Sequence, residues 1–243
     1  MKFALHKNRF NKFLKYSGVM LIAGSIFAGY QFLTPSFYIH GQSMLPSISP
    51  SKVYPGYRLF SSESVKRGDV VAISPELLSS KDVQHPNGLY IKRIVGLPGD
   101  TLTFTKSEGN LVAINGLKMV FSPIENGKSF SLRSKMDDSQ GASIAGIPFK
   151  YTDPYGNTHL GYQSVWDENA FTHDAGTNKF AEVVFNMPFL DGQANDKGMV
   201  FVTVPKGTFF ALSDNLTVGT DSRHFGFVPE ESVKAKLLLR DTK

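Results

Sequence analysis

A stretch without charge near the N-terminus limits what this chain can fold into more than any other feature. Residues 16–51 contain no Lys, Arg, Asp or Glu, and residues 18–33 are almost wholly apolar. A helix over this apolar run covers about 24 Å, slightly less than the roughly 30 Å hydrocarbon core of a bilayer. We therefore predict one transmembrane helix over residues 17–34, which Pro35 ends.

A cleaved secretion signal and a buried helix are the alternatives to a membrane anchor. A cleaved signal needs two small residues, separated by one residue of any kind, after the apolar run, but residues 30–33 are the bulky sequence Tyr-Gln-Phe-Leu. The small residues at 23–25 meet this need only if the apolar run is cut short. A retained anchor therefore fits the sequence better.

The positive charge of the chain is concentrated before the apolar run. Of the 26 basic residues, five lie within residues 1–16 with no acidic residue, so the remaining 21 balance the 21 acidic residues. This bias predicts a basic cytoplasmic tail over residues 1–16 and a body on the periplasmic or extracytoplasmic side of the cytoplasmic (inner) membrane. A body without excess positive charge argues against nucleic acid as a partner.

The body carries mainly strand signals. Strands are predicted at residues 69–73, 89–95, 101–105, 111–114, 117–121, 181–185, 199–204, 208–212 and 233–239, with a hairpin turn at Asn115-Gly116. Residues 106–198 are richer in Gly, Ser, Asn and Asp and have shorter apolar runs. We expect a mainly β fold, in which residues 35–105 and 199–243 form one β domain and residues 106–198 form an inserted β and loop subdomain.

Ser43 is the first candidate for chemistry. It lies two residues after Gly41 and three before Pro46, which presents it on a bend. Serine is a weak nucleophile until a base takes its proton. The segment lacks the second glycine of a nucleophile elbow, and His40 has no carboxylate nearby in the sequence to orient it as a base. The alternative is a serine that only forms a turn.

Lys92 is the candidate base, on the strand predicted at residues 89–95. A lysine accepts a proton only when neutral, and burial among apolar groups can lower its pKa of about 10.4 by roughly 3–5 units. Alternation along the strand places Lys92 on one face with Tyr90 and Ile94, and Arg93 on the other. At least one of the two cations is therefore expected to be buried. The alternative is an edge strand whose cations reach water.

Other catalytic centres fit less well. The chain has no cysteine, which excludes disulfides, thiol nucleophiles and cysteine metal sites. Its six histidines are scattered without the spacing of zinc ligands. The acidic pair Asp137-Asp138 lies in a polar stretch typical of a solvated turn. We therefore expect neither a metal nor a cofactor.

Taken together, the motifs resemble those of bacterial type I signal peptidases. The matching segments are Gly-Gln-Ser-Met-Leu-Pro-Ser at 41–47, Arg-Gly-Asp-Val-Val at 67–71, Tyr-Ile-Lys-Arg-Ile-Val-Gly-Leu-Pro-Gly-Asp at 90–100, Ser-Asp-Asn at 213–215 and Asp-Ser-Arg-His-Phe-Gly-Phe-Val-Pro at 221–229. They occur in the family's order behind an apolar anchor, which makes the combination specific. The resemblance covers about residues 38–105 and 199–230.

The resemblance implies a Ser-Lys dyad in which Ser43 is the nucleophile and Lys92 the general base. It also implies that the Ser43 backbone N–H stabilises the oxyanion. The substrate-pocket positions that it carries over are Phe37, Ile39, Met44, Ile48, Tyr90 and Ile91. The supporting positions are Arg93, Asp214, Asp221, Ser222 and Arg223.

Four positions depart from the family's pattern. Gly41 stands where some members have Ser or Thr as a second oxyanion donor. Gly219 stands where some have a serine that contacts the base lysine, which leaves Thr217 or Thr220 as candidates for that role. Ser213 stands where glycine is usual, and His224 stands where an aromatic residue is usual.

The leading interpretation is a membrane-bound endopeptidase that removes N-terminal signal peptides from exported preproteins after small residues at −1 and −3. Its partners would be those preproteins, docked as an added strand, and the lipid bilayer. Two alternatives stay open at this point. One is a specialised peptidase that matures pilin or secretion-system subunits, and the other is a non-catalytic, anchored peptide-binding domain.

Overall fold

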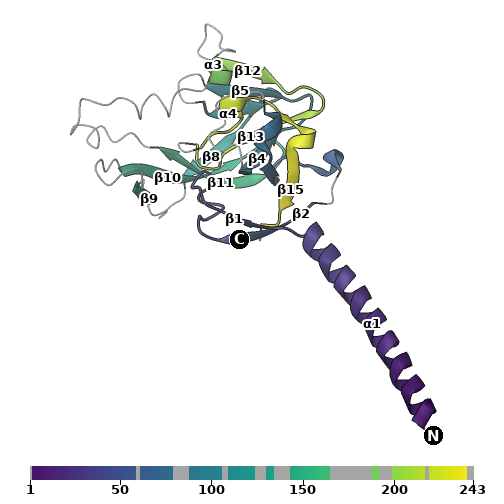
Figure 1. The fold of residues 1–243 in the computed structure, drawn as a ribbon. Coiled ribbons are helices and arrows are strands. Elements are labelled where there is room, and N and C mark those ends of the chain that lie inside the picture. Colours follow the sequence, from purple (N-terminus) through teal and green to yellow (C-terminus); the bar gives the residue numbers. More distant parts are fainter. Residues whose placement is uncertain are drawn as a thin grey trace.

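The computed structural model describes residues 2–58, 61–78, 88–105, 109–123, 130–133, 143–164, 188–191, 199–216 and 219–239. The chain begins with one long helix, α1 (Lys2–Leu33), which projects away from a β-rich body (Figure 1). The part of α1 from Tyr16 to Leu33 is apolar and long enough to cross a membrane, and none of it is buried against the body. The predicted N-terminal apolar helix is therefore confirmed. The helix also includes the basic segment before the apolar run.

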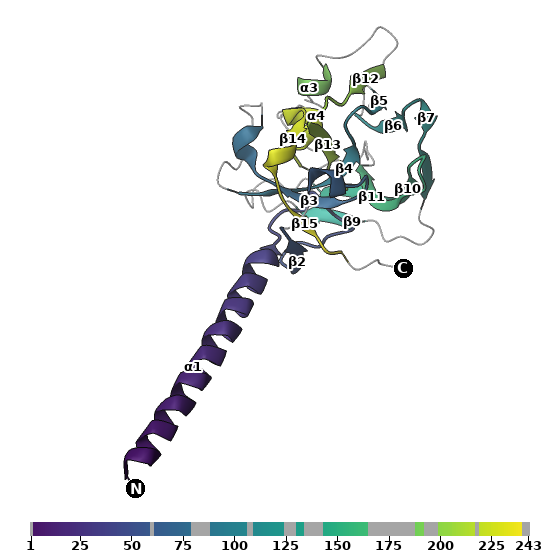
Figure 2. The same cartoon turned by 90° about the vertical axis from the view of Figure 1, so that its right-hand side faces the viewer.

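Helix α1 ends at Leu33 because the chain two residues later cannot continue its hydrogen bonds. Thr34 makes the last contacts, because its backbone N–H and its hydroxyl both donate to the Tyr30 carbonyl, at 2.9 and 2.6 Å. Pro35 has no backbone N–H to continue the pattern. The next residues form the edge strand β1, and Figure 2 shows α1 meeting the body beside β2.

The largest sheet has seven antiparallel strands. In spatial order they are β1 (Ser36–Tyr38), β2 (Val53–Tyr57), β15 (Val233–Leu237), β3 (Val70–Ile73), β4 (Tyr90–Gly96), β13 (Thr208–Leu212) and β14 (Val228–Pro229). The sheet is covered on both faces near its centre: Val71 and Ile73 of β3 pack in one buried cluster, and Val70 and Ala72 in another. A strand covered on both faces reads as a continuous apolar run, which explains the sequence of β3.

A second sheet packs at the end of the body that faces away from α1. Its order is β12 (Met199–Thr203), β5 (Thr101–Thr105), β6 (Leu111–Ile114) and β7 (Leu117–Lys118). The predicted hairpin at Asn115-Gly116 is confirmed, and both residues have positive φ, 53° and 76°, as a tight turn of this kind requires. The pairing of β6 with β5 places the start of the proposed insertion in the same sheet as residues 101–105.

A third sheet contains β8 (Val120–Pro123), β10 (Ser143–Thr152) and β11 (Thr158–Ser164), with β9 (Phe130–Arg133) paired to the other half of β10. The strand predicted at residues 117–121 is interrupted at Met119. The Met119 N–H donates to the Val112 carbonyl and its side chain is buried in the core, so β7 stays with β6 while β8 leaves to pair with β10.

Short helices complete the described residues. Two are α-helical, α3 (Pro188–Asp191) and α4 (Ser222–Phe225), and three are 3-10 turns at Ser62–Ser64, Pro75–Leu77 and Glu230–Ser232. The remaining predicted strands agree with the structure to within two residues, apart from residues 181–185, which lie outside the described residues. The mainly β fold class is thus confirmed.

Candidate active site

Ser43 lies on a bend just beyond the edge strand β1, and several contacts fix its position. Leu45 N–H donates to the Gln42 carbonyl at 3.1 Å, and Asn215 N–H donates to the Ser43 carbonyl at 2.9 Å. The next side chain, Met44, is almost fully buried. The Ser43 hydroxyl is therefore held at the surface of the body by a buried residue on one side and by the chain after β13 on the other.

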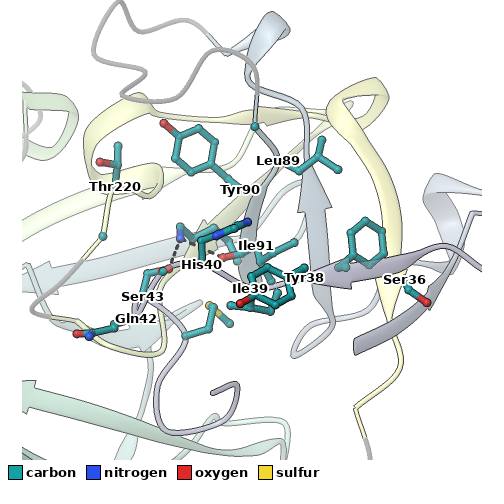
Figure 3. A pocket seen from close by; sticks show the side chains of 16 residues that line it. Ser36, Tyr38, Ile39, His40, Gln42, Ser43, Leu89, Tyr90, Ile91 and Thr220 are labelled. Atoms are coloured by element: carbon teal, nitrogen blue, oxygen red, sulfur yellow. Dashed lines mark hydrogen bonds between the residues drawn. The ribbon is translucent and has the colours of Figure 1, made fainter. Parts of the chain in front are cut away.

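Lys92 approaches Ser43 from the centre of the large sheet. Its strand, β4, pairs with β3 on one side and with β13 on the other, and the residue is only 2% exposed. Lys92 Nζ lies 2.8 Å from Ser43 Oγ and donates to the Ile91 carbonyl at 3.0 Å (Figure 3). The structure thus joins two side chains that are 49 residues apart in the sequence.

The environment of Lys92 favours the neutral amine. Burial lowers the pKa of Lys92 from 10.5 to about 8, against the opposing effects of the nearby carboxylates of Asp221 and Asp214, and Arg223 lowers it further. At a pKa of 8 about one lysine in ten is neutral at pH 7, compared with about three in ten thousand at the ordinary value. Lys92 can therefore accept a proton at neutral pH.

Asp221 and Arg223 form a buried ion pair at the start of α4. Arg223 donates to the two carboxylate oxygens of Asp221 at 2.9 and 2.8 Å, and the Ser213 N–H donates to the same carboxylate at 3.0 Å. Although burial alone would raise it, Arg223 and His224 hold the pKa of Asp221 well below its usual value. The carboxylate is therefore ionised, and it links α4 to the end of β13.

Arg93 and Asp214 form a second buried pair, on the opposite face of β4 from Lys92. The guanidinium binds the carboxylate through two hydrogen bonds of 2.7 and 2.6 Å and donates a third to the Gly68 carbonyl at 2.7 Å. Bidentate pairs of this kind fix orientation as well as charge. The last predicted supporting residue, Ser222, is fully buried, and its hydroxyl accepts from the Ala211 N–H at 3.0 Å.

A groove of about 870 Å³ opens in front of the two side chains. Two segments line it, residues 36–44 and 88–92, together with Gly219 and Thr220. Figure 3 shows Ser43 between Thr220 on one side and the β1 residues on the other. The groove is mostly apolar and is bordered by β1, whose outer edge pairs with no other strand in the described part of the chain, as a site for an extended peptide requires.

The predicted pocket residues divide into two groups. Five of the six line the groove: Phe37, Ile39, Met44, Tyr90 and Ile91. Ile48 does not line the groove but is fully buried beneath it, in the same cluster as Ile39 and Met44. His40 lies exposed in the groove with its ring 4.6 Å from that of Tyr38, and among the described residues it makes no hydrogen bond to Ser43.

The backbone N–H of Ser43 can stabilise a negative charge that develops beside it. In the described part of the chain the Ser43 N–H has no hydrogen-bond acceptor, so it is available as a donor. At Gly41 a methyl group would meet nothing within 4 Å, so glycine is not required there by crowding. Of the two threonines considered as partners of the lysine, Thr220 lines the groove without a hydrogen bond to Lys92, and Thr217 lies outside the described residues.

Sequence reasoning missed two features of the site. Asn215 was part of a motif but had no assigned role, and its backbone holds Ser43 in place. The second is the cover over Arg93, which comes from β10 and β11: a methyl group on Gly68 would touch the His159 ring at 2.8 Å. Burial lowers the pKa of His159 to about 4, so this ring is neutral at pH 7. The polar sequence around these strands gave no signal that they cover a buried ion pair.

Known proteins resemble this chain over nearly its whole length. The model of one family, described as signal peptidase, peptidase S26, matches residues 12–240. Signal peptidase I of Buchnera aphidicola is 25% identical over 243 residues, covering 85% of this chain and 69% of that protein. Signal peptidase I of Streptococcus pneumoniae is 26% identical over 237 residues, covering 96% and 95%. A crystal structure of a signal peptidase I from Enterococcus faecalis is 21% identical, with a TM-score of 0.32 over 72% of this chain and 97% of that one.

Proposed function

Because this chain belongs to the signal peptidase family, peptidase S26, we propose that it is a membrane-bound serine endopeptidase that removes signal peptides from exported preproteins by means of a Ser43-Lys92 dyad. The observation that supports this most strongly is the 2.8 Å contact between the Ser43 hydroxyl and a lysine amine that is 2% exposed. A buried amine with a lowered pKa is what a serine nucleophile needs as its base.

The reaction begins with proton transfer from Ser43 to the neutral Lys92 amine. Ser43 Oγ then bonds to the carbonyl carbon of the scissile peptide, and the carbonyl oxygen takes up the electron pair as an oxyanion. The Ser43 N–H donates to this oxyanion. The Lys92 ammonium returns its proton to the amide nitrogen, which leaves as the new N-terminus of the mature protein and leaves an ester on Ser43.

The second half releases the signal peptide. Lys92 is neutral again after donating its proton, and it now takes a proton from water, whose oxygen attacks the ester carbon. Collapse of this intermediate breaks the bond to Ser43 Oγ, which recovers its proton from Lys92. The products are a free carboxylate on the signal peptide and the starting enzyme.

The groove favours an extended substrate with small side chains near the cleavage site. A peptide placed along the free edge of β1 would run between residues 36–44 and 88–92, with its carbonyl over Ser43. Ile39 and Met44 are almost fully buried in the floor of this groove. A floor so tightly packed leaves shallow pockets, which fit a preference for small residues at −1 and −3.

The proposed placement follows from α1. Its apolar part crosses the membrane, and its basic N-terminal part stays in the cytoplasm by the positive-inside rule. The body then stands on the periplasmic or extracytoplasmic side, where signal peptides emerge. The proposed catalytic domain, residues 35–105 and 199–243, contributes every residue assigned here to the dyad and its support. The proposed insertion is residues 106–198.

The test uses the full-length protein in detergent and a preprotein whose signal peptide ends in Ala-x-Ala. Wild type is expected to cut after the second alanine, as read from the product masses, and Ser43→Ala and Lys92→Ala should each lose essentially all activity. Lys206→Ala, which removes an exposed lysine, is the control and should cleave normally. Near-normal turnover by Lys92→Ala at pH 7 would refute the dyad. Peptide binding without cleavage by wild type would instead favour a binding domain.

A further inference from the structure

Lys92 has more hydrogen-bond donors than the described acceptors satisfy. A neutral amine has two N–H groups and one lone pair, and an ammonium has three N–H groups. In the proposed reaction the lone pair faces the Ser43 hydroxyl and one N–H donates to the Ile91 carbonyl at 3.0 Å. When Lys92 takes the proton of Ser43, one N–H points to the departing nitrogen and another stays on Ile91. The third N–H then needs an acceptor.

Ser213 carries an acceptor without a partner beside the dyad. Ser213 is 2% exposed, and its backbone N–H donates to Asp221, but its hydroxyl has no hydrogen-bond partner among the described residues. Buried hydroxyls without partners are rare in folded proteins, because the interior offers no water to replace the lost hydrogen bonds. One other described side chain shares this state, the hydroxyl of Ser232, the last residue of the 3-10 turn before β15.

Gly219 connects the Ser213 hydroxyl to the nucleophile. A methyl group on Gly219 would lie 2.9 Å from Ser213 Oγ and 2.5 Å from Ser43 Cβ, so those two atoms are no farther apart than the sum of these distances. Gly219 also has a φ of +122°, a backbone conformation that residues other than glycine rarely adopt. The glycine therefore leaves open the space between the unpaired hydroxyl and the dyad.

We propose that Ser213 is a positioning residue of the dyad, whose hydroxyl accepts the third N–H of the Lys92 ammonium that forms when Ser43 attacks. The two groups are not hydrogen-bonded in the resting structure, so the contact forms with the change in charge, through rotation of the Ser213 hydroxyl side chain or movement of the lysine tip. This inference rests on the proposed function. The N–H that the Ser213 hydroxyl accepts is already present on the neutral amine, and the positive charge that Lys92 gains when Ser43 attacks makes that N–H a stronger donor.

The test compares Ser213→Ala and Ser213→Gly with Ser232→Ala, all in the full-length protein. Ser232→Ala is a matched control, because it removes the other buried and unpaired hydroxyl from a position outside the site. Asp214, Asp221 and Arg223, which also act on Lys92, are unchanged in all three variants. The measurement is kcat and KM on the preprotein from pH 6 to pH 10, with thermal unfolding to confirm the fold of each variant.

A hydrogen bond to a charged group corresponds to roughly a tenfold to hundredfold change in an equilibrium constant. We therefore expect kcat at pH 7 to fall by about tenfold or more in both Ser213 variants, with little change in KM. The rising limb of kcat/KM should move to lower pH, because the lost contact stabilises the charged lysine. Ser232→Ala should match wild type in both respects.

The outcomes separate this inference from the proposed function. If both Ser213 variants keep the wild-type kcat and pH limb while Lys92→Ala is inactive, the role of Ser213 is refuted and the dyad stands. A lower kcat with an unmoved limb shows a purely structural role and also refutes the inference. If wild type does not cleave, or Lys92→Ala cleaves normally, both proposals fall. Because Ser213→Gly and Ser213→Ala differ in size, agreement between them excludes a packing effect.

Discussion

Replacing Lys92 with methionine tests the buried amine without relying on catalysis. Burial lowers the pKa of Lys92 from 10.5 to about 8, so the folded protein disfavours the charged form. Between pH 8 and pH 10.5 the unfolded chain holds a proton on this lysine that the folded chain has released. The stability of the wild type therefore rises with pH across this window, and below pH 8 the full destabilisation remains. A methionine side chain has a similar length and no charge, so the Lys92→Met variant lacks this pH-dependent cost.

The size of the effect follows from the change in pKa. One pKa unit corresponds to about 1.4 kcal/mol, so the charged lysine costs the fold about 3.4 kcal/mol below pH 8 and about 0.8 kcal/mol at pH 10. The methionine loses contacts to Ser43 and Ile91, each worth about 1 kcal/mol, but these losses change little with pH. The advantage in unfolding free energy of Lys92→Met over wild type should thus shrink by about 2.5 kcal/mol from pH 7 to pH 10.

The assay is urea unfolding of the full-length protein in mild detergent, followed by circular dichroism at pH 7, 8, 9 and 10. Lys206→Met provides the control, because Lys206 is exposed and its replacement should shift the unfolding free energy equally at every pH. The reasoning fails if the curves for Lys92→Met and wild type run parallel from pH 7 to pH 10. Parallel curves would mean that Lys92 titrates at the same pH in the folded and unfolded chains.

Two further predictions concern the surroundings of the dyad. Asp214→Asn should lower the unfolding free energy, measured by urea unfolding, by about 3–5 kcal/mol, because it leaves the buried Arg93 without a countercharge. A loss below about 1 kcal/mol would show that the pair is accessible to solvent. Gly219→Ala should lower kcat at least a hundredfold with a folded body, since its methyl group would lie 2.5 Å from Ser43 Cβ, and normal kinetics would contradict this geometry. Gly207→Ala is its control, with a φ of +75° and open space around it, and should cost only about 1–3 kcal/mol of stability.

The strands could be predicted from the sequence because their signals are local. An apolar run identifies β3, the alternation of Thr with Leu and Phe identifies β5, and Asn115-Gly116 identifies the hairpin. The interruption at Met119 was not predictable in this way, because it depends on β10 taking β8 as a partner from far along the chain. A single strand and two short strands in different sheets have the same local pattern.

Which cation would be buried could not be decided from alternation along β4. The pattern correctly places Lys92 and Arg93 on opposite faces, but both are buried, at 2% and 5% exposure. The alternative of an edge strand is wrong, because β4 lies between β3 and β13. Burial on both faces requires covers from distant segments, the Ser43 bend on one side and the sheet of β10 and β11 on the other. Neither cover has a signal near Lys92 in the sequence.

The two ion pairs beside the proposed dyad affect the pKa of Lys92. An unpaired carboxylate near Lys92 would stabilise the ammonium and keep the pKa high, which would defeat the base. Asp221 is bound by Arg223, and Asp214 by Arg93, so each carboxylate carries its own countercharge at 2.6–2.9 Å. Arg223 opposes the effect of the two carboxylates on the pKa of Lys92, and burial, which has the largest effect, lowers that pKa. The pairs therefore supply rigid hydrogen-bonding groups around the site, while burial keeps the pKa of Lys92 below its ordinary value.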